Sequence, residues 1–317
     1  MKRILSLVIG AAALAALTVP AMAQSWPTQR VTIVVPFGAG SVTDILARIF
    51  AEDMGRRWGQ QVIVENHPGL AGTASVAKAA PDGYTLMVTS NGHTVSGLVS
   101  KDAPFDPVKS FSGITRLGSA PLFLITSPEL PVKTLKDVID LAKKEPGKLN
   151  FSSPGLASTT FIAGALFRKA AGINIVHVPF RSAPDAVTAV MRNDAQLYFA
   201  PVNLARDQSK AGKVKAIAAA TAKRIPDMPD TPTFTEDGLP FVYDSWFGLL
   251  APAGVPKDIL NKIAADWAAA LKTPDMQAKL KAQFVIAASD QPDDLDKIIA
   301  KETANLTEVF KDINISQ

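Results

Sequence analysis

The sequence predicts an α/β protein with a parallel sheet that carries helices on both faces. Three observations support this class. Short runs of β-branched residues, such as Val31 to Val35, alternate with segments whose apolar residues recur at helical spacing. Turns rich in glycine, proline and hydroxyl residues separate the two kinds of segment. The composition, 47% hydrophobic with only 7% aromatic residues, is typical of a soluble globular chain of this class.

The N-terminus has the three parts of a signal peptide. Lys2 and Arg3 form a basic region, Ile4 to Val19 is apolar and uncharged, and Ala21-Met22-Ala23 has the small-x-small pattern of a cleavage site. We therefore expect export and a mature chain that begins at Gln24. The alternative is a membrane anchor, but the apolar run is near the lower limit for a span and a cleavable site follows it at once.

Charge and cysteine content exclude several classes. The chain has 33 basic and 29 acidic side chains, and removing Lys2 and Arg3 leaves a net charge near +2, too balanced for a nucleic-acid surface. There is no cysteine, so an exported product would need no disulfide. A mature chain of about 294 residues has room for two domains of ordinary size.

The first half of the chain begins with a strand, a turn and a helix. The predicted elements that follow Val31 to Val35 are a helix with apolar positions over Ile45 to Met54, a strand Gln61 to Asn66, a helix Gly72 to Ala80 and a strand Tyr84 to Thr89. Between the last two, Pro81-Asp82-Gly83 has turn chemistry.

The turn Pro36 to Ser41 is a candidate anion site. It joins a buried strand to a helix, so free backbone N–H groups and a positive dipole end point beyond the strand. The alternative is an ordinary turn, since most strand-to-helix turns bind nothing. Asp44 lies in the first turn of the helix, where it could cap the helix or accept a hydrogen bond from a ligand.

A second unit follows Leu122 to Thr126 and repeats the same device. Its predicted elements are a helix Leu135 to Lys144, a strand Leu149 to Ser152, a small-residue turn Ser153 to Thr160, a helix Phe161 to Ala171, a strand Ile175 to Pro179, a helix Ala183 to Arg192 and a strand Ala195 to Phe199. Two such turns facing one another across a cleft would hold one acidic ligand from two sides. We expect Ser158, Thr159 and the backbone amides of Ala39 to Ser41 to supply the hydrogen bonds.

The C-terminal third returns to the first unit. A proline-rich loop, Ile225 to Pro240, precedes a strand Trp246 to Pro252, and helices cover Ile259 to Leu271, the stretch from Met276, and Leu295 to Phe310. If the chain crosses between domains near Leu122 to Thr126 and again near Asp244 to Leu250, the two crossings form a two-strand hinge.

The sequence lacks the usual signatures of catalysis. His67, His93 and His177 are the only histidines, and with no cysteine or metal-ligand spacing we expect no metal and no cofactor. Gly40-Ser41 and Ser96-Gly97 do not complete the elbow of a serine hydrolase, which is the enzymatic alternative. Arg181 could pair with a carboxylate in the cleft or be a solvated or interdomain arginine.

Several motifs together resemble the periplasmic receptors of the tripartite tricarboxylate transporter family, the Bug receptors. They span nearly the whole mature chain in order. The motifs are Val34 to Asp44 with Ala47-Arg48, Val64 to Gly69, Ala79 to Leu86, His177 to Arg181, Ala211 to Ala218, Asp230 to Thr233 with Glu236 to Pro240, and Trp246 to Leu249 with Ala251 to Pro256.

The resemblance implies two α/β domains of the type II periplasmic-binding-protein kind, with a ligand in the cleft between them. It implies domain 1 from residues 24–122 and 247–317, domain 2 from 123–246, and a monomer that delivers a small organic carboxylate to inner-membrane permease subunits. A receptor that serves a sensor partner is an alternative. The implied binding positions are Phe37, Ala39, Gly40, Ser41, Thr43, Asp44, Ser90, Asn91, Ser153, Gly155, Ala157, Ser158, Thr159, Phe180, Arg181 and Ser182.

Four of these positions depart from the usual family pattern. Ser41 stands where a second glycine is common, and Ala157 replaces a glycine of the second turn. Phe180 and Ser182 stand where tyrosine and glycine are common, so the pocket would lack a phenolic hydroxyl there. The sequence does not say whether the ligand is a dicarboxylate, a tricarboxylate, an amino acid or an aromatic acid.

Overall fold

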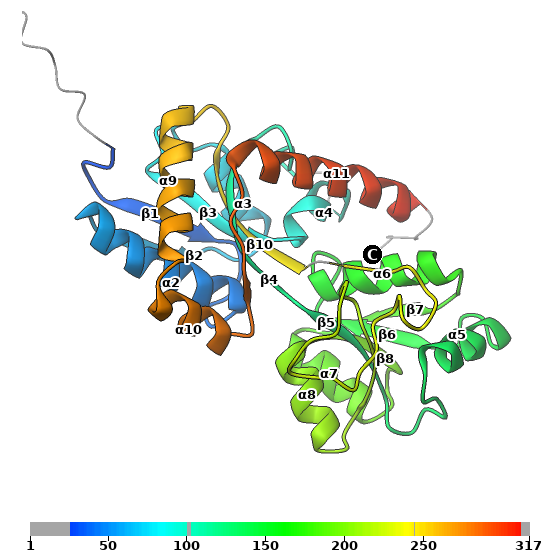
Figure 1. Cartoon of the computed structure of the whole chain (residues 1–317). Coiled ribbons are helices and arrows are strands. Elements are labelled where there is room, and N and C mark those ends of the chain that lie inside the picture. Colours follow the sequence, from blue (N-terminus) through cyan, green and yellow to red (C-terminus); the bar gives the residue numbers. More distant parts are fainter. Residues whose placement is uncertain (1–25, 100–102, 244, 312–317) are drawn as a thin grey trace, which may run out of the picture.

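A computed structural model describes residues 26–99, 103–243 and 245–311. It has two β-sheets, each flanked by helices (Figure 1). We call the six-stranded sheet with its helices the first lobe and the five-stranded sheet with its helices the second lobe. The predicted signal peptide lies outside the described residues, and none of the described helices is both long and apolar enough to cross a bilayer.

The first lobe is built from both ends of the described chain. Its sheet has the order β11-β4-β10-β3-β1-β2. Its strands are β1 (Val31–Val35), β2 (Val62–Asn66), β3 (Thr85–Ser90), β4 (Phe111–Ala120), β10 (Ser245–Pro252) and β11 (Ile286–Ala287). Its helices are α2 (Val42–Trp58), α3 (Leu70–Ala77), α4 (Gly92–Val99), α9 (Lys257–Ala270), α10 (Pro274–Ala282) and α11 (Pro292–Lys311).

The second lobe comes from the middle of the chain, and its sheet has the order β7-β6-β8-β5-β9. Its strands are β5 (Leu122–Thr126), β6 (Asn150–Ser153), β7 (Val176–Pro179), β8 (Leu197–Pro201) and β9 (Lys215–Ala219). Its helices are α5 (Leu135–Lys144), α6 (Thr159–Ala171), α7 (Ala183–Met191) and α8 (Val202–Lys210).

The α/β class is confirmed, and the parallel pairing expected from the sequence holds for part of each sheet. Strands β1, β2 and β3 pair in parallel, as do β6, β7 and β8. Strand β10 pairs antiparallel with β3 and β4, and β5 pairs antiparallel with β8 and β9. The β4–β10 pair is antiparallel because the chain leaves the first lobe along β4 and returns along β10 beside it.

The chain passes between the sheets twice within the described residues. The first passage is Pro121, between β4 and β5, and the second joins the loop after β9 to β10. The two passages adjoin, since Ser245 pairs with Ala120 and the Tyr243 N–H donates to the Ala220 carbonyl at 3.0 Å. The domain bounds expected from the sequence stay a prediction.

Five elements are absent from the sequence-based prediction: β4, α4, α8, β9 and the two-residue β11. Strand β4 contains Gly113 and Gly118, which weaken its pattern, and the structure shows why they stand there. A Cβ at Gly118 would lie 2.3 Å from Val285 Cγ1, and one at Gly113 would lie 2.9 Å from Asp296 Oδ1. These glycines let the C-terminal segment approach β4 closely.

Long helices begin at side-chain caps that the sequence supplies. Ser41 caps α2 by accepting from the Asp44 N–H at 3.2 Å, and Ser158 caps α6 by accepting from the Phe161 N–H at 3.2 Å. Each helix ends at a glycine in the left-handed conformation, Gly59 or Gly172. The caps fix where each helix begins, and therefore where its free N–H groups lie.

Candidate functional site

The two lobes place equivalent junctions at the carboxyl ends of their parallel strands. In the first sheet β1 lies between β2 and β3, and in the second sheet β6 lies between β7 and β8. Ligands of open α/β sheets bind where the strand order reverses in this way, beyond the carboxyl ends. The relevant junctions here are β1–α2 and β3–α4 in the first lobe, and β6–α6 and β8–α8 in the second.

In the β1–α2 turn, two of the three backbone amides predicted to bind a ligand already donate hydrogen bonds within the turn. The Gly40 N–H donates to Asp44 Oδ2 at 2.9 Å, and the Ser41 N–H donates to the Gly38 carbonyl at 3.2 Å. Within the described chain, the N–H groups of Ala39, Val42 and Thr43 meet no internal acceptor. Of the amides predicted from Ala39 to Ser41, therefore, only that of Ala39 is available to a ligand.

Asp44 is held by its own loop. The residue is 2% exposed, and its carboxylate accepts hydrogen bonds from the Gly40 N–H, from Arg48 Nε at 3.1 Å and from Asn66 Nδ2 at 2.9 Å. Burial would raise the pKa of this carboxyl, but these bonds outweigh burial and hold its pKa below the usual range. Of its two sequence-based roles, the geometry favours shaping the turn over accepting from a ligand.

The hydroxyls of Ser158 and Thr159 in the β6–α6 turn, which the sequence predicts as two ligand donors, differ in their hydrogen bonding. Ser158 Oγ donates to the Gly155 carbonyl at 2.6 Å while it caps α6. Thr159, the first residue of α6, is half-buried, and its hydroxyl has no hydrogen-bond partner among the described residues. Thr159 is thus the hydroxyl of this turn that can donate to a ligand without breaking a bond.

Ser153 and His177 form a pair beneath the same turn. Ser153 is fully buried, and its Oγ lies 2.7 Å from His177 Nε2 and 3.2 Å from the Gly155 carbonyl oxygen. Burial lowers the pKa of His177 to about 4, so the ring is neutral at pH 7. Through these bonds the pair holds the backbone of the turn at Gly155.

The lobes touch where the β3–α4 junction meets the β6–α6 turn. A Cβ at Gly92 would lie only 2.1 Å from the Ala157 carbonyl oxygen, so the glycine permits a backbone contact. Ser90 and Asn91, which precede it, are 5% and 0% exposed. Both Asn91 side-chain ends are engaged: Oδ1 accepts from the Trp246 N–H at 2.8 Å, and Nδ2 donates to Glu302 Oε1 at 2.8 Å.

Phe180, Arg181 and Ser182 lie at the same edge of the second sheet, because the Phe180 N–H donates to the Ser153 carbonyl at 2.8 Å. Ser182 caps α7. Phe180 packs against a buried apolar cluster that includes Val187 and Val190 of the same helix. Arg181 is exposed and lines a surface hollow of about 620 Å³ with Arg192 and other second-lobe residues. Its role in ligand binding stays a prediction.

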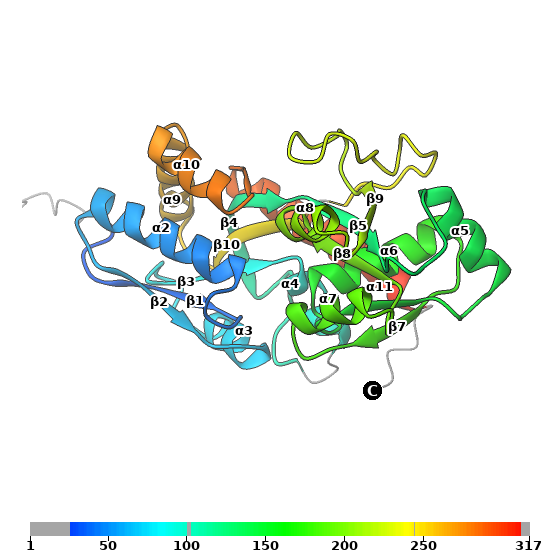
Figure 2. The same ribbon diagram turned by 90° about the horizontal axis from the view of Figure 1, so that it is seen from below.

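A groove of about 800 Å³ runs between the lobes at the β8–α8 junction. Seen from below in Figure 2, α2 and α10 of the first lobe stand across from α7 and α8 of the second. One wall is lined by first-lobe residues of α10 and β11, and the other by Pro121, Val202 and Ile225 to Asp227. The sequence-based site omits this junction, although the strand Ala195 to Phe199 followed by Pro201 signals another strand-to-helix turn.

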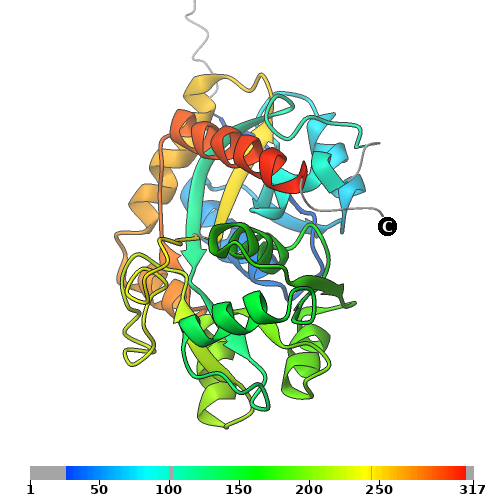
Figure 3. The same ribbon diagram turned by 90° about the vertical axis from the view of Figure 1, so that its right-hand side faces the viewer.

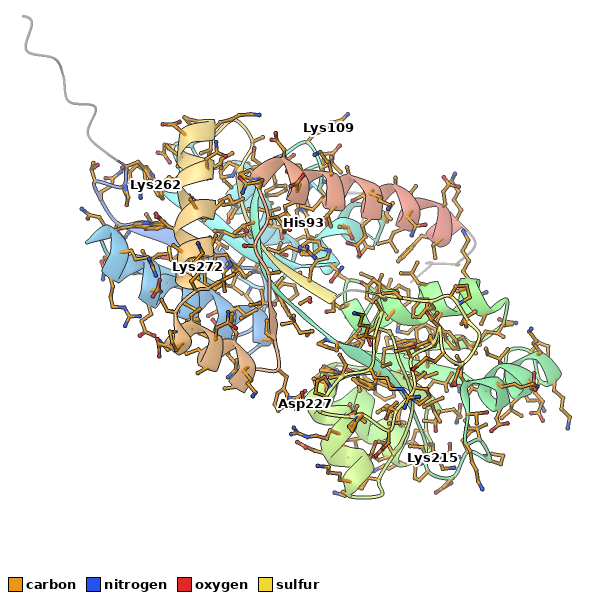
Figure 4. The ribbon with its side chains drawn as sticks, in the orientation of Figure 1. His93, Lys109, Lys215, Asp227, Lys262 and Lys272 are labelled. Carbon is orange, nitrogen blue, oxygen red and sulfur yellow. The ribbon has the colours of Figure 1, made fainter. Side chains whose placement is uncertain are left out.

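His93 has a structural environment inside the first lobe (Figure 4). Its Nε2 donates to the Pro107 carbonyl at 2.7 Å, and its ring packs edge-on against Phe111. Burial lowers the pKa of His93 to about 4. Across the described residues, no group of three or more acidic or histidine side chains is placed to hold a metal ion.

The comparison with protein families decides the identity of this arrangement. Residues 46–315 match the family described as "Tripartite tricarboxylate transporter family receptor". The chain belongs to that family. It is a family of periplasmic solute-binding receptors, which agrees with the resemblance found in the sequence.

Individual members of the receptor family match over most of their length. The chain is 28% identical to the protein BugT of Bordetella pertussis over 95% of this chain and 94% of that one. It superposes on an R. palustris protein with adipate at a TM-score of 0.77, with 30% identity over 90% of this chain and 97% of that one. For MatC from Rhodopseudomonas palustris with bound malate, the TM-score is 0.75, with 30% identity over 90% and 99%.

Proposed function

We propose that this receptor captures a small organic carboxylate between its lobes and delivers it to a tripartite tricarboxylate-type permease. The ligand is a dicarboxylate, a tricarboxylate or an aromatic acid. One carboxylate end meets the N-terminus of α2, with the N–H groups of Ala39, Val42 and Thr43. The other end meets the N-terminus of α6, with the hydroxyl of Thr159. The mature protein begins at Gln24 and works as a periplasmic monomer.

One observation carries the proposal. Each lobe presents a long, serine-capped helix directly after the central parallel strand, and the first free N–H groups of both helices have no internal acceptor in the described chain. Such helix ends stabilise a desolvated carboxylate without a basic side chain. The nearby Arg48 cannot supply the charge freely, because it pairs with Asp44 at 2.9 Å.

The similar proteins support this chemistry. The two R. palustris structures contain adipate and malate, which are both dicarboxylates. An acid with two carboxylates separated by a few carbons would suit two helix N-termini on opposite walls of a cleft. Contacts made to both lobes would shift the population toward the closed form, which the permease would then recognise.

Replacing Thr159 by Ala should weaken binding of the carboxylate about ten-fold or more. A hydrogen bond to a charged group contributes about 1.5–3 kcal/mol, and no other hydroxyl of the turn can replace it. Calorimetric titration with adipate, malate, citrate and benzoate measures the effect on whichever of these acids binds.

Ser158→Ala is the matched control, one residue away. It removes the cap of α6 and should cost about 1 kcal/mol of folding stability, with a smaller change in affinity than Thr159→Ala. If Thr159→Ala binds like the parent while Ser158→Ala loses affinity, the hydroxyl assignment in this turn is wrong.

The enzymatic alternative would be a secreted hydrolase, and the Ser153–His177 pair is the observation that favours it. A nucleophile must reach a substrate and needs a base oriented by an acid. Ser153 is 0% exposed, and within the described ranges no carboxylate contacts His177. We expect no turnover of an ester panel, and Ser153-dependent hydrolysis at enzyme-like rates would favour the hydrolase.

A further inference from the structure

Helix α11 packs against both lobes. In Figure 1 it runs from the first lobe out over α6, and Figure 3 shows it across the outer side of the molecule. Leu295 and Ile299 belong to a first-lobe cluster, whereas Leu306, Val309 and Phe310 belong to the core of the second lobe. The Phe310 ring meets Phe161 of α6 edge-on, at 5.6 Å between centroids.

Glu302 lies between these two apolar segments and faces the chain passage. Its Oε1 accepts from Asn91 Nδ2 at 2.8 Å, and its Oε2 accepts from the Trp246 indole Nε1 at 2.7 Å. The Asn91 amide closes the triangle, because its Oδ1 accepts from the Trp246 N–H at 2.8 Å. Asn91 and Trp246 are buried, at 0% and 2% exposure.

We infer that Glu302 is a positioning residue that fixes the ligand-facing β3–α4 junction relative to the passage strand β10 and to helix α11. The inference rests on the proposed carboxylate site, because it takes Ser90 to Gly92 as part of that site. Asn91 acts as a structural link here and not as a ligand contact. The Glu302 carboxylate then sets both the angle between the lobes and the position of the β3–α4 junction.

The three groups require a definite pattern of donors and acceptors. Glu302 must accept twice, and Asn91 must accept once and donate once. Glu302→Gln places an amide NH₂ against another donor, and Asn91→Asp places two carboxylates together. Combining the two changes restores these three bonds, since Asp at 91 accepts from Trp246 N–H and from Gln at 302, whose oxygen accepts from the indole. The double variant has the parent's net charge and nearly its shape.

Interlobe distance in the ligand-free mature protein tests the inference. The chain contains no cysteine, so Lys262→Cys on α9 and Lys210→Cys at the end of α8 give one spin label in each lobe. We expect pulsed electron paramagnetic resonance to show a shifted and broader distance distribution for Glu302→Gln and for Asn91→Asp. We expect the parent distribution in Asn91→Asp/Glu302→Gln.

Glu308→Gln, on the exposed face of the same helix, should leave the distribution unchanged. Folded single variants with the parent distribution would overturn the inference, and so would a double variant that stays broad. If both single variants fail to fold, a folded double variant with the parent distribution supports it, and an unfolded double variant contradicts it. Because no ligand is present, none of these outcomes bears on the carboxylate proposal.

Discussion

Replacing Gly92 by Ala should reduce carboxylate affinity about a hundred-fold. The new methyl group would lie 2.1 Å from the Ala157 carbonyl oxygen, far inside contact distance, and that oxygen belongs to backbone that cannot rotate away. The lobes must therefore separate or the β6–α6 turn must shift. Losing two hydrogen bonds to the charged ligand, at about 1.5 kcal/mol each, lowers the affinity about a hundred-fold. Calorimetric titration with the dicarboxylates of the similar proteins measures the loss.

Gly97→Ala in the same helix is the matched control. A Cβ there would meet Pro107 Cδ at 3.5 Å, which is ordinary contact, and alanine favours a helix over glycine by up to about 1 kcal/mol. Its affinity should equal the parent's, with equal or higher thermal stability. Parent-like affinity in Gly92→Ala would mean that the contact between the lobes does not govern binding.

Folding stability should fall as the pH drops from about 6.5 to about 4. Burial lowers the pKa of His93 to about 4, whereas an unfolded histidine titrates near 6.5, so the unfolded chain binds more protons in this window. The contribution of His93 is complete above pH 6.5 and amounts to about 3 kcal/mol. His177, whose pKa is also about 4, adds a smaller effect of the same sign because solvent reaches it.

His93→Gln removes this titration while leaving an amide that can donate to the Pro107 carbonyl. Urea denaturation at pH 4.5 and 7 should show a smaller pH dependence for His93→Gln than for the parent. His67→Gln, at an exposed histidine, is the matched control for exchanging a histidine for glutamine. An unchanged slope in His93→Gln would contradict the assignment of this residue.

Elements with strong local patterns could be predicted from the sequence. The helix Leu135 to Lys144 agrees residue for residue with α5, because Thr134 and Asp137 form a capping box at its start. Strand β4 and helix α4 could not, since Gly113 and Gly118 in β4 and Gly92 in α4 serve close approaches to residues distant in the sequence. The antiparallel return of β10 depends on which strands pair across the passage, which local periodicity does not specify.

For the candidate site, the sequence could predict the turns but not the hydrogen bonds within them. Small-residue turns at strand ends located the helix N-termini, but they could not show which donors are free. The Gly40 and Ser41 N–H groups and the Ser158 hydroxyl each donate to an acceptor in their own turn, and these bonds depend on how the turn folds. The engagement of Asn91 by Glu302 joins residues 211 positions apart, beyond the reach of any local motif.

A crystal structure with the best-binding carboxylate tests the central claim most directly. The ligand is chosen from a thermal-shift panel of organic acids, in which a ligand at a hundred times its dissociation constant adds about 2.7 kcal/mol. We predict one carboxylate within hydrogen-bond distance of the Ala39, Val42 or Thr43 N–H groups, and the other end at Thr159. A carboxylate bound away from both helix N-termini, for example in the hollow beside Arg181 and Arg192, would contradict the account.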